Sequence, residues 1–261
     1  MAVDVVREAR AEGGFVARIT IDRAAKLNAL DRALMAEIID AMTPLADDPA
    51  LRLAVVSGAG GRAFIGGADI VELAVLDADS ARGFITAVHV CCDAFRHLPV
   101  PAIARIDGYA LGAGLELAAA CDFRIASDRS VFGMPEVRIG LPSVVEAALL
   151  PGLIGPARTR QLLLTGDNIP ADEALAWGLV DRVVPAAQLD DAVEVLAASI
   201  LAAGPQAVRL QKSLILDWEE MHTAAAVDRG IDGFVEAFET DEPRRMTNAA
   251  RAAMRARQKA G

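Results

Sequence analysis

Two glutamates, Glu116 and Glu136, lie twenty residues apart in strongly apolar surroundings. Glu116 is the only charged residue between Gly108 and Cys121, and Glu136 follows a proline among apolar neighbours. Burying an ionised carboxylate costs several kcal/mol unless a partner neutralises it. Two carboxylates in such a setting favour general acid–base chemistry. The structural alternative, which is stronger for either acid taken alone, is a glutamate at a helix terminus and a second one at the surface.

Glycine-rich segments near these acids indicate backbone hydrogen-bond donors. A helix begins at Gly112-Ala113-Gly114, and its first N–H groups have no intrahelical acceptor. Such a group gains from the helix dipole and stabilises an oxyanion. The segment Gly66-Gly67-Ala68, before an expected short helix over residues 69–76, presents a second donor in the same way. Two donors and two carboxylates suit a reaction through the enolate of a thioester. The alternative is that these glycines only permit tight helix–strand packing.

Short β-branched runs alternate with helical patterns in the first half of the chain, which favours a parallel α/β arrangement. Strands are expected at Phe15–Ile21, Leu53–Ser57, Ala102–Ile106, Phe123–Ala126 and Val180–Val184. The apolar stripe of residues 31–45 predicts a helix with Asp31 as its N-cap.

The pattern after about Val145 is mostly helical. Helices are expected at residues 147–154, 157–164, 171–178, 189–203 and 205–218. We therefore expect an α/β core with the site over residues 1–185 and a helical region over residues 186–261. The helical region is too small to bury its own apolar face, so it packs on the core or on another subunit.

Composition predicts a protein without a nucleic-acid or membrane partner. Its 54% hydrophobic content supplies ample core for 261 residues, and its net charge of −10 argues against a nucleic-acid surface. No apolar run reaches the roughly 18 residues of a membrane span, and the charged N-terminus is unlike a signal peptide. Three cysteines without a CxxC pair indicate reduced thiols of a cytoplasmic protein. Three histidines without clustered ligands predict no metal site.

Several enzyme classes are excluded by missing motifs. A dinucleotide fingerprint needs GxGxxG between a strand and a helix, whereas residues 58–63 lead into another apolar run. The chain has no Gly-Lys-Ser/Thr phosphate loop and no Gly-x-Ser-x-Gly nucleophile elbow. These absences argue against a nicotinamide-dependent oxidoreductase, a P-loop NTPase and a serine hydrolase.

The C-terminal tail is basic and holds no acid after residue 243. Its cations are Arg244, Arg245, Arg251, Arg255, Arg257 and Lys259. A solvated basic helix that complements its own dipole and a local site for phosphates explain this composition equally well.

Four segments together resemble the crotonase superfamily (enoyl-CoA hydratase/isomerase family). The most specific is the run of residues 106–142, IDGYALGAGLELAAACDFRIASDRSVFGMPEVRIGLP. RAAKLNAL (23–30) and FIGGADI (64–70) precede it, and LTGDNI (164–169) with residues 171–184 follows it. Four matches in the family's order make coincidence negligible. The resemblance implies an α/β fold, a crotonase-like spiral of ββα repeats, followed by a helical C-terminal trimerisation region.

The resemblance also implies the roles of individual residues. The backbone N–H groups of Ala68 and Ala113 hold the thioester oxygen, and Glu116 and Glu136 occupy the positions of the hydratases' two catalytic acids. Glu116 orients and deprotonates water, and Glu136 manages the proton at the α carbon. Coenzyme A is part of the substrate, so no separate cofactor is implied. The expected substrate contacts are Lys26, Ile65, Asp69, Ile70, Val71 and Ser143.

The chain departs from the family pattern at several points. Ser143 stands where the family usually has the glycine whose N–H helps to hold the water. Glu146 is a third acid near the expected pocket, either a ligand contact or a first-turn helix charge. The family's proline after Arg23 and the C-terminal aromatic that covers CoA are missing. Lys26 and the basic tail remain as CoA contacts.

Retention of both acids favours an enoyl-CoA hydratase, because many relatives with other reactions lack one of them. The alternatives are an isomerase or another acyl-CoA lyase or hydrolase of the same fold, and a non-catalytic acyl-CoA-binding homologue. We expect a homotrimer or a dimer of trimers, as is typical of the family. Acyl chain length, branching and pathway depend on variable pocket walls, such as residues 71–95 and 144–150.

Overall fold

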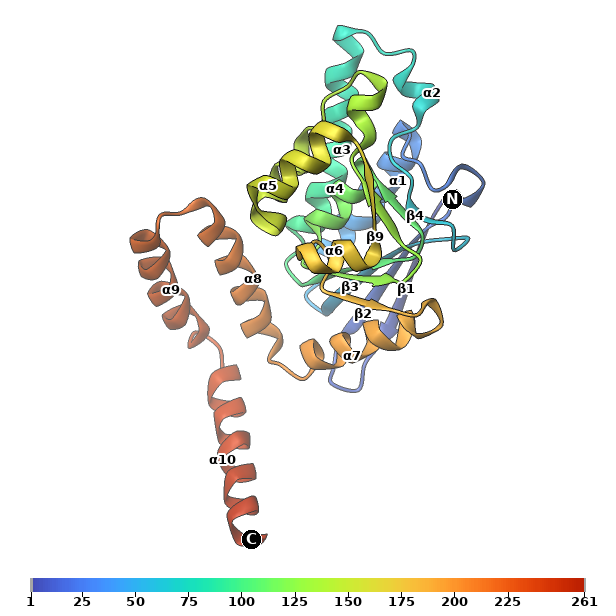
Figure 1. Ribbon diagram of the computed structural model, residues 1–261. Coiled ribbons are helices and arrows are strands. Elements are labelled where there is room, and N and C mark those ends of the chain that lie inside the picture. Colours follow the sequence, from blue (N-terminus) through green and yellow to red (C-terminus); the bar gives the residue numbers. More distant parts are fainter. Residues whose placement is uncertain (1, 261) are drawn as a thin grey trace. The chain divides into compact units, whose positions relative to one another are not determined.

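The computed structural model describes residues 2–260, with side chains up to residue 258. The strands are β1 (Val3–Ala9), β2 (Phe15–Ile21), β3 (Leu51–Gly58), β4 (Ala63–Ile65), β5 (Ala102–Ile106), β6 (Tyr109–Leu111), β7 (Phe123–Ser127), β8 (Val131–Gly133), β9 (Asn168–Pro170) and β10 (Arg182–Val184). They form a six-stranded sheet of order β1-β2-β3-β5-β7-β10 and a four-stranded sheet of order β4-β6-β8-β9 (Figure 1).

Successive strand pairs divide between the two sheets. β3, β5 and β7 enter the larger sheet, and the strand after each of them, β4, β6 or β8, enters the smaller one. Pairing is parallel from β2 to β10 and from β4 to β8, whereas β1 and β9 are antiparallel edge strands. The five predicted strands are all present, and the expected spiral of ββα repeats is confirmed. β3 reads as a continuous buried run, as expected for a parallel strand covered on both faces.

Six helices surround these sheets: α1 (Arg32–Ala46), α2 (Ile70–Leu73), α3 (Ala78–Arg96), α4 (Ala113–Ala120), α5 (Leu150–Thr165) and α6 (Ala171–Trp177). Asp31 caps α1 by accepting a hydrogen bond from the Leu34 N–H, as predicted. The two helices expected at 147–154 and 157–164 are joined in α5, with a break at Gly155 (φ 76°). α4 is buried along its whole length, which places its N-terminus inside the protein.

The sequence did not predict α3 or the strands β1, β4, β6, β8 and β9, so the whole smaller sheet was missed. α3 begins at a capping box between Asp77 and Ser80. Its buried side chains follow helical spacing: Phe84, Val88, Cys91, Cys92 and Phe95. The signal was therefore present in the sequence, but β-branched and aromatic residues in this stretch weaken its helical propensity.

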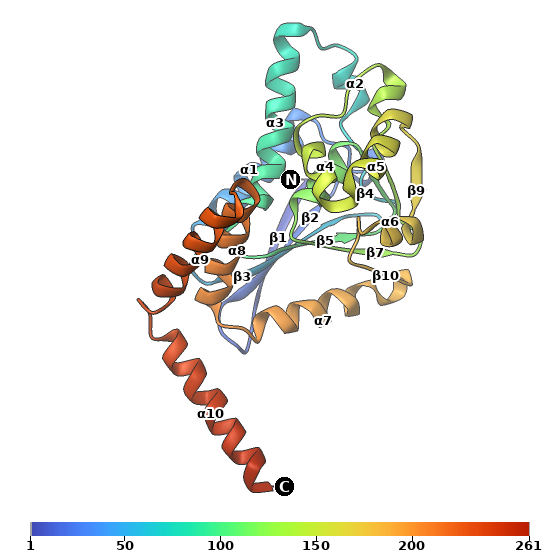
Figure 2. The same ribbon diagram turned by 60° about the vertical axis from the view of Figure 1, so that its left-hand side comes forward.

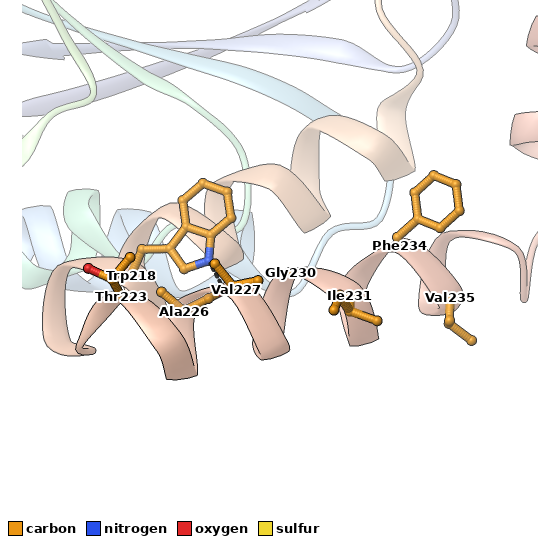
Figure 3. A pocket seen from close by; sticks show the side chains of 8 residues that line it. All are labelled: Trp218, Thr223, Ala226, Val227, Gly230, Ile231, Phe234 and Val235. Atoms are coloured by element: carbon orange, nitrogen blue, oxygen red, sulfur yellow. Dashed lines mark hydrogen bonds between the residues drawn. The ribbon is translucent and has the colours of Figure 1, made fainter.

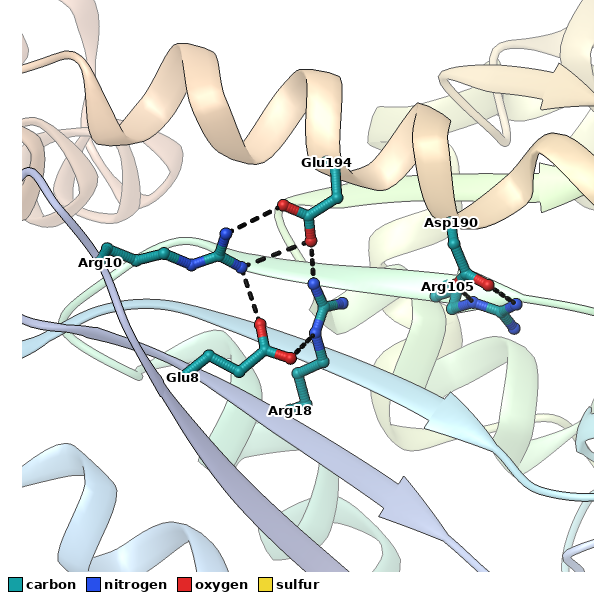
Figure 4. Close-up of polar contacts among 6 residues, drawn as sticks. All are labelled: Glu8, Arg10, Arg18, Arg105, Asp190 and Glu194. Carbon is teal, nitrogen blue, oxygen red and sulfur yellow. Dashed lines mark hydrogen bonds and ion pairs between the residues drawn. The ribbon is translucent and has the colours of Figure 1, made fainter.

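α7 (Leu189–Leu201) carries the boundary between two compact units, which lies between Ala197 and Ala198 rather than at 185/186. The first part of α7 lies along the larger sheet, on the face opposite α4 (Figures 1 and 2). Glu194 accepts from both Arg10 and Arg18, and Glu8 joins the same network (Figure 4).

A second ion pair joins the same helix to the sheet. Asp190 accepts from Arg105 of β5 at 2.5 Å. Charges on α7 thus find their partners on the sheet, which explains why this stretch belongs to the first unit.

The second unit is helical, as expected, with α8 (Pro205–Glu220), α9 (Thr223–Ala237) and α10 (Glu242–Ala260). The Trp218 indole N–H donates to the Ala226 carbonyl at 2.9 Å and joins α8 to α9. Glu242, at the start of α10, accepts from the Gln206 and Ala207 N–H groups at the N-terminus of α8.

No single described helix is long and apolar enough to cross a membrane. Only one bent pair, Ala186–Leu201 with Pro205–Glu220, meets the length and composition when taken together. Among residues 2–260, no three His, Cys, Asp or Glu side chains are grouped as metal ligands would be.

Candidate active site

A cavity of about 520 Å³ lies at the N-terminus of α4, in the first unit. Its walls include Glu116, Glu136, Ala68 and Ala113. Lys26, Asp69, Ile70, Val71 and Ser143 line it as well. The fold thus brings segments from four separate parts of the chain into one cavity. Nine of the ten predicted site residues meet there.

The N-terminus of α4 supplies the first backbone donor. Gly112 is its N-cap, with φ 50°, and Ala113 is its first residue. The Ala113 N–H therefore has no intrahelical acceptor, and it lies at the positive end of the helix dipole. Gly114 packs so closely on β4 that a Cβ would overlap the Ile65 carbonyl. The glycines therefore serve tight packing and the presentation of a donor together.

The second donor lies in the loop after β4. Leu30 donates to the Gly67 carbonyl at 2.8 Å, and Asp69 donates to the Leu30 carbonyl at 2.8 Å. These two bonds form a parallel bridge that does not use the Ala68 amide itself. Gly67 has φ 112°, a conformation that side chains rarely allow, and it sets the direction of the next peptide.

Glu116 lies on α4 and is only 4% exposed. Its Oε1 accepts a hydrogen bond from the Ala147 N–H at 3.3 Å. Burial, followed by repulsion from Glu136, raises the pKa of Glu116 to about 8. At neutral pH the Glu116 carboxyl therefore holds a proton. The acid pair thus contains a proton that it can donate inside the cavity.

Glu136 lies opposite, in the 3₁₀ turn Pro135–Ile139. Its Oε1 rests directly against Gly112, because a Cβ on that glycine would overlap it. Its Oε2 accepts from the Ser143 hydroxyl at 2.8 Å. The two acids, one protonated and one oriented by a hydroxyl, thus flank the helix terminus that presents Ala113.

Comparison with known proteins identifies the family. Residues 11–252 match the enoyl-CoA hydratase/isomerase family. The chain belongs to this family. It is 39% identical over 228 residues to the crotonyl-CoA hydratase of Syntrophomonas wolfei, covering 87% of this chain and 88% of that protein. It is 34% identical over 230 residues to the short-chain-enoyl-CoA hydratase of Clostridium acetobutylicum, covering 88% of each.

The fold agrees with solved structures of the family. The structure of an enoyl-CoA hydratase from Bacillus anthracis superposes on this chain with a TM-score of 0.91. The match covers 97% of both chains at 30% identity. The resemblance to the crotonase superfamily that rested on four sequence segments is therefore confirmed.

Ser143 replaces a family glycine, and the structure shows what its side chain contacts. Its hydroxyl donates to Glu136, so it orients one acid of the pair. A hydrogen bond of this kind contributes about 0.5–1.5 kcal/mol. We expect Ser143→Ala to lower kcat for crotonyl-CoA roughly tenfold, with little change in KM, in a spectrophotometric hydration assay. Ser143→Thr retains the hydroxyl and is the control, and equal activity of all three proteins would contradict this role.

Ile65 is the one predicted substrate contact that the structure does not bring to the cavity. It is fully buried in β4 and is not among the described residues that line the cavity. Its carbonyl packs against Gly114, so its position in the family motif reflects helix packing rather than ligand contact.

Asp69 lines the cavity but is also tied to protein groups. It caps α2 through the Val71 N–H and pairs with Arg23 at 2.8 Å and Lys26 at 3.4 Å. The Val71 N–H and these two cations lower its pKa despite burial. Asp69 therefore connects the loop after β4 to the segment that carries Lys26, which is half-exposed.

Part of the apolar wall of the cavity comes from α3, within the stretch 71–95 that was expected to form a pocket wall. Phe84, Ile85 and Val88 face the cavity from this helix. Leu141 and Val144 line it as well. These side chains form the region where an acyl chain is excluded from water.

Proposed function

We infer that this chain is an enoyl-CoA hydratase, which adds water across the 2,3 double bond of a 2-enoyl-CoA thioester. The observation that carries this inference is that Glu116 and Glu136 line one cavity together with Ala68 and Ala113, the two residues expected to supply backbone donors. The similarity to a crotonyl-CoA hydratase and a short-chain-enoyl-CoA hydratase supports this assignment.

The chemistry uses groups of the chain and the substrate. The amides of Ala68 and Ala113 stabilise the enolate oxygen, at roughly 3 kcal/mol of barrier for each donor. Water attacks the β carbon as one carboxylate takes its proton, and the α carbon receives a proton from the other acid. Acid–base assistance contributes about 10²–10⁴-fold. No cofactor is needed beyond the CoA of the substrate, so we expect full activity after dialysis against EDTA.

The pair works with one proton between its two members, since hydration needs one base and one acid. At rest this proton is on Glu116, the more buried acid. The family resemblance implies that Glu116 is the base that activates water. Glu116 can act as this base only after its proton has moved to Glu136. Exchange of the α protons of butyryl-CoA in D₂O identifies the acid that serves the α carbon, because exchange needs that acid alone. Survival of exchange in Glu116→Gln and its loss in Glu136→Gln would support Glu116 as the base.

The raised pKa of Glu116 predicts the alkaline limit of activity. The working pair retains its proton up to about pH 8 and loses it above that value. We expect kcat/KM for crotonyl-CoA to fall about tenfold per pH unit above pH 8. The measurement is a pH profile at constant ionic strength, with circular dichroism to confirm folding. A rate that rises through pH 10 would show that the fully ionised pair is the active form.

The test of function is loss of the conjugated enoyl absorbance when purified protein meets crotonyl-CoA. Product formation as 3-hydroxybutyryl-CoA, checked by mass spectrometry, supports hydration. Conversion of a 3-enoyl-CoA to a 2-enoyl-CoA without hydration would show that the chain is an isomerase and would overturn the hydratase assignment. Binding of acyl-CoA without any turnover would indicate a non-catalytic homologue. A panel of acyl-CoA esters then defines chain length and branching.

We also propose that the second unit mediates self-association into a trimer or a dimer of trimers. α9 exposes a stripe at helical spacing: Val227, Ile231, Phe234, Val235 and Phe238. Figure 3 shows Ile231 and Phe234 along an apolar cavity of about 520 Å³ that also includes Trp218 of α8. An apolar stripe of this size is typical of a protein–protein interface.

Phe234→Asp tests this interface. Phe234 is 68% exposed, so the substitution leaves the subunit's own packing intact while placing a charge in the proposed contact. We expect the mass from light scattering to fall to that of the 27.4 kDa monomer. Phe234→Leu, which stays apolar, is the control. A monomeric native protein, or an unchanged oligomer with Asp, would contradict the proposal.

We propose a cytoplasmic location, supported by the buried cysteines Cys91 and Cys92, which are free thiols. Burial raises the pKa of Cys91 to about 12 and holds it as a thiol. Cell fractionation tests this location, and recovery of the protein outside the cytoplasmic fraction would overturn it.

A further inference from the structure

Glu146 is a third acid beside the cavity, and its surroundings differ from both expectations raised by the sequence. It is 5% exposed and is not among the described residues that line the cavity, so it is neither a surface charge nor a ligand contact. Its Oε1 lies 2.6 Å from Nδ1 of His89 on α3. Its Oε2 is buried and meets no hydrogen-bond donor among residues 2–260. His89 is thus the main partner of a buried carboxylate.

The backbone next to Glu146 is strained. Val145 has φ 42°, in the left-handed region that β-branched residues avoid. Such a conformation costs on the order of 1–3 kcal/mol and persists only when its surroundings hold it. Val145 opens the 3₁₀ turn Val145–Leu149, which packs against both α3 and α4. The His89–Glu146 contact joins this turn directly to α3.

The strained turn supports the proposed acid Glu116. The N–H of Ala147, the residue after Glu146, donates to Glu116 Oε1 at 3.3 Å. The same N–H contacts the Val144 carbonyl at 2.9 Å, so its direction depends on the conformation of the turn. Val144 itself lines the cavity. A shift of this turn would therefore move a donor of Glu116 and a wall of the site together.

We propose that His89 and Glu146 are positioning residues for Glu116, because their contact fixes the 144–147 turn whose Ala147 N–H orients the Glu116 carboxyl. This role rests on the proposed function, in which Glu116 is one of the two acids. Neither residue touches the substrate. Four titratable groups surround Glu146: His89, Cys91 and Cys92 from α3 and Glu116 from α4.

Matched substitutions of His89 separate positioning from bulk stability. His89→Asn places an amide N–H where Nδ1 lies and retains the contact, whereas His89→Phe fills the space without a donor. We expect His89→Phe to lower kcat roughly 10- to 100-fold with KM nearly unchanged, and His89→Asn to restore most of it. His97 pairs with Asp93 on the same helix at 2.7 Å, so His97→Phe is the control and is expected to be fully active. Equal kcat in His89→Phe and the native protein would overturn the proposal.

Relief of the backbone strain is a second test. Glycine adopts a positive φ without cost. Glu146→Ala is expected to lower kcat as His89→Phe does, and adding Val145→Gly is expected to recover part of the loss. The absence of any recovery would show that the pair does not act through the turn.

A titration makes the test independent of turnover. In protein labelled with ¹³C at glutamate carboxyls, the Glu116 resonance is assigned by its loss in Glu116→Gln. Because repulsion from Glu146 helps to raise the pKa of Glu116, Glu146→Gln is expected to lower the midpoint of the Glu116 titration. An unchanged midpoint overturns the coupling. If crotonyl-CoA is not hydrated but the midpoint shifts, the proposed function fails while the coupling of Glu146 to Glu116 stands.

Discussion

Glu116→Gln is expected to reduce hydration of crotonyl-CoA by about 10²–10⁴-fold, because the amide can neither give nor take the proton that the reaction moves. Glu136→Gln is expected to cause a loss of the same order, since each acid performs a separate proton transfer. The residual rates are measured as loss of the conjugated enoyl absorbance of crotonyl-CoA at high enzyme concentration. Full activity in either variant would eliminate the two-acid mechanism.

The same substitution of Glu116 is expected to stabilise the protein at alkaline pH. The folded state retains a proton on Glu116 up to about pH 8, whereas the unfolded chain loses it near pH 4.5. The native protein therefore loses stability as pH rises between these values, and glutamine removes that dependence. We expect a gain on the order of 5 kcal/mol in unfolding free energy at pH 8.5 and almost none at pH 4.5.

Denaturant unfolding at both pH values measures this difference. The glutamine side chain in Glu116→Gln retains an acceptor for the Ala147 N–H, so the comparison isolates the ionisation. A gain of equal size at both pH values would assign the effect to packing instead. Glu116→Gln is therefore expected to be more stable and less active than the native protein, as is common where an active site buries an ionisable group.

Gly112→Ala is expected to lower kcat by about 10²–10³-fold, the usual cost of losing one oxyanion donor. Gly112 has φ 50° and ψ −123°, a conformation that favours glycine. A Cβ there would also overlap Oε1 of Glu136. The helix terminus and the acid must move apart, which displaces the Ala113 amide and Glu136 together.

Gly152→Ala is the matched control. Gly152 lies in α5, and a Cβ there meets no described atom within 4 Å. We expect this variant to keep native activity and to be slightly more stable, because alanine is favoured over glycine in helices. Native kcat in Gly112→Ala would show that neither the Ala113 donor nor the position of Glu136 limits the reaction.

Local patterns in the sequence predicted strands β2, β3, β5, β7 and β10 of the larger sheet and most of the helices, but no strand of the smaller sheet. The β-branched runs became strands, and the Asp31 cap and the glycine at 112 both began helices as expected. The helical conformation of α3 escaped prediction, although Phe84, Ile85 and Val88 lie within the stretch 71–95 that was expected to form a pocket wall. The unit boundary moved to 197/198 because α7 finds its ionic partners on the sheet. Such partners are distant in sequence and leave no local pattern.

The sequence by itself determined the acid pair, the glycines that present Ala68 and Ala113, and the family, because these depend on residue type and order. Tertiary structure alone decided the chemical state of the site. Burial and Glu136 hold a proton on Glu116, and Ser143 becomes a donor to the second acid. Glu146 finds its partner 57 residues away on α3. A pKa and a hydrogen bond depend on neighbours in space, and only the packed fold supplies them.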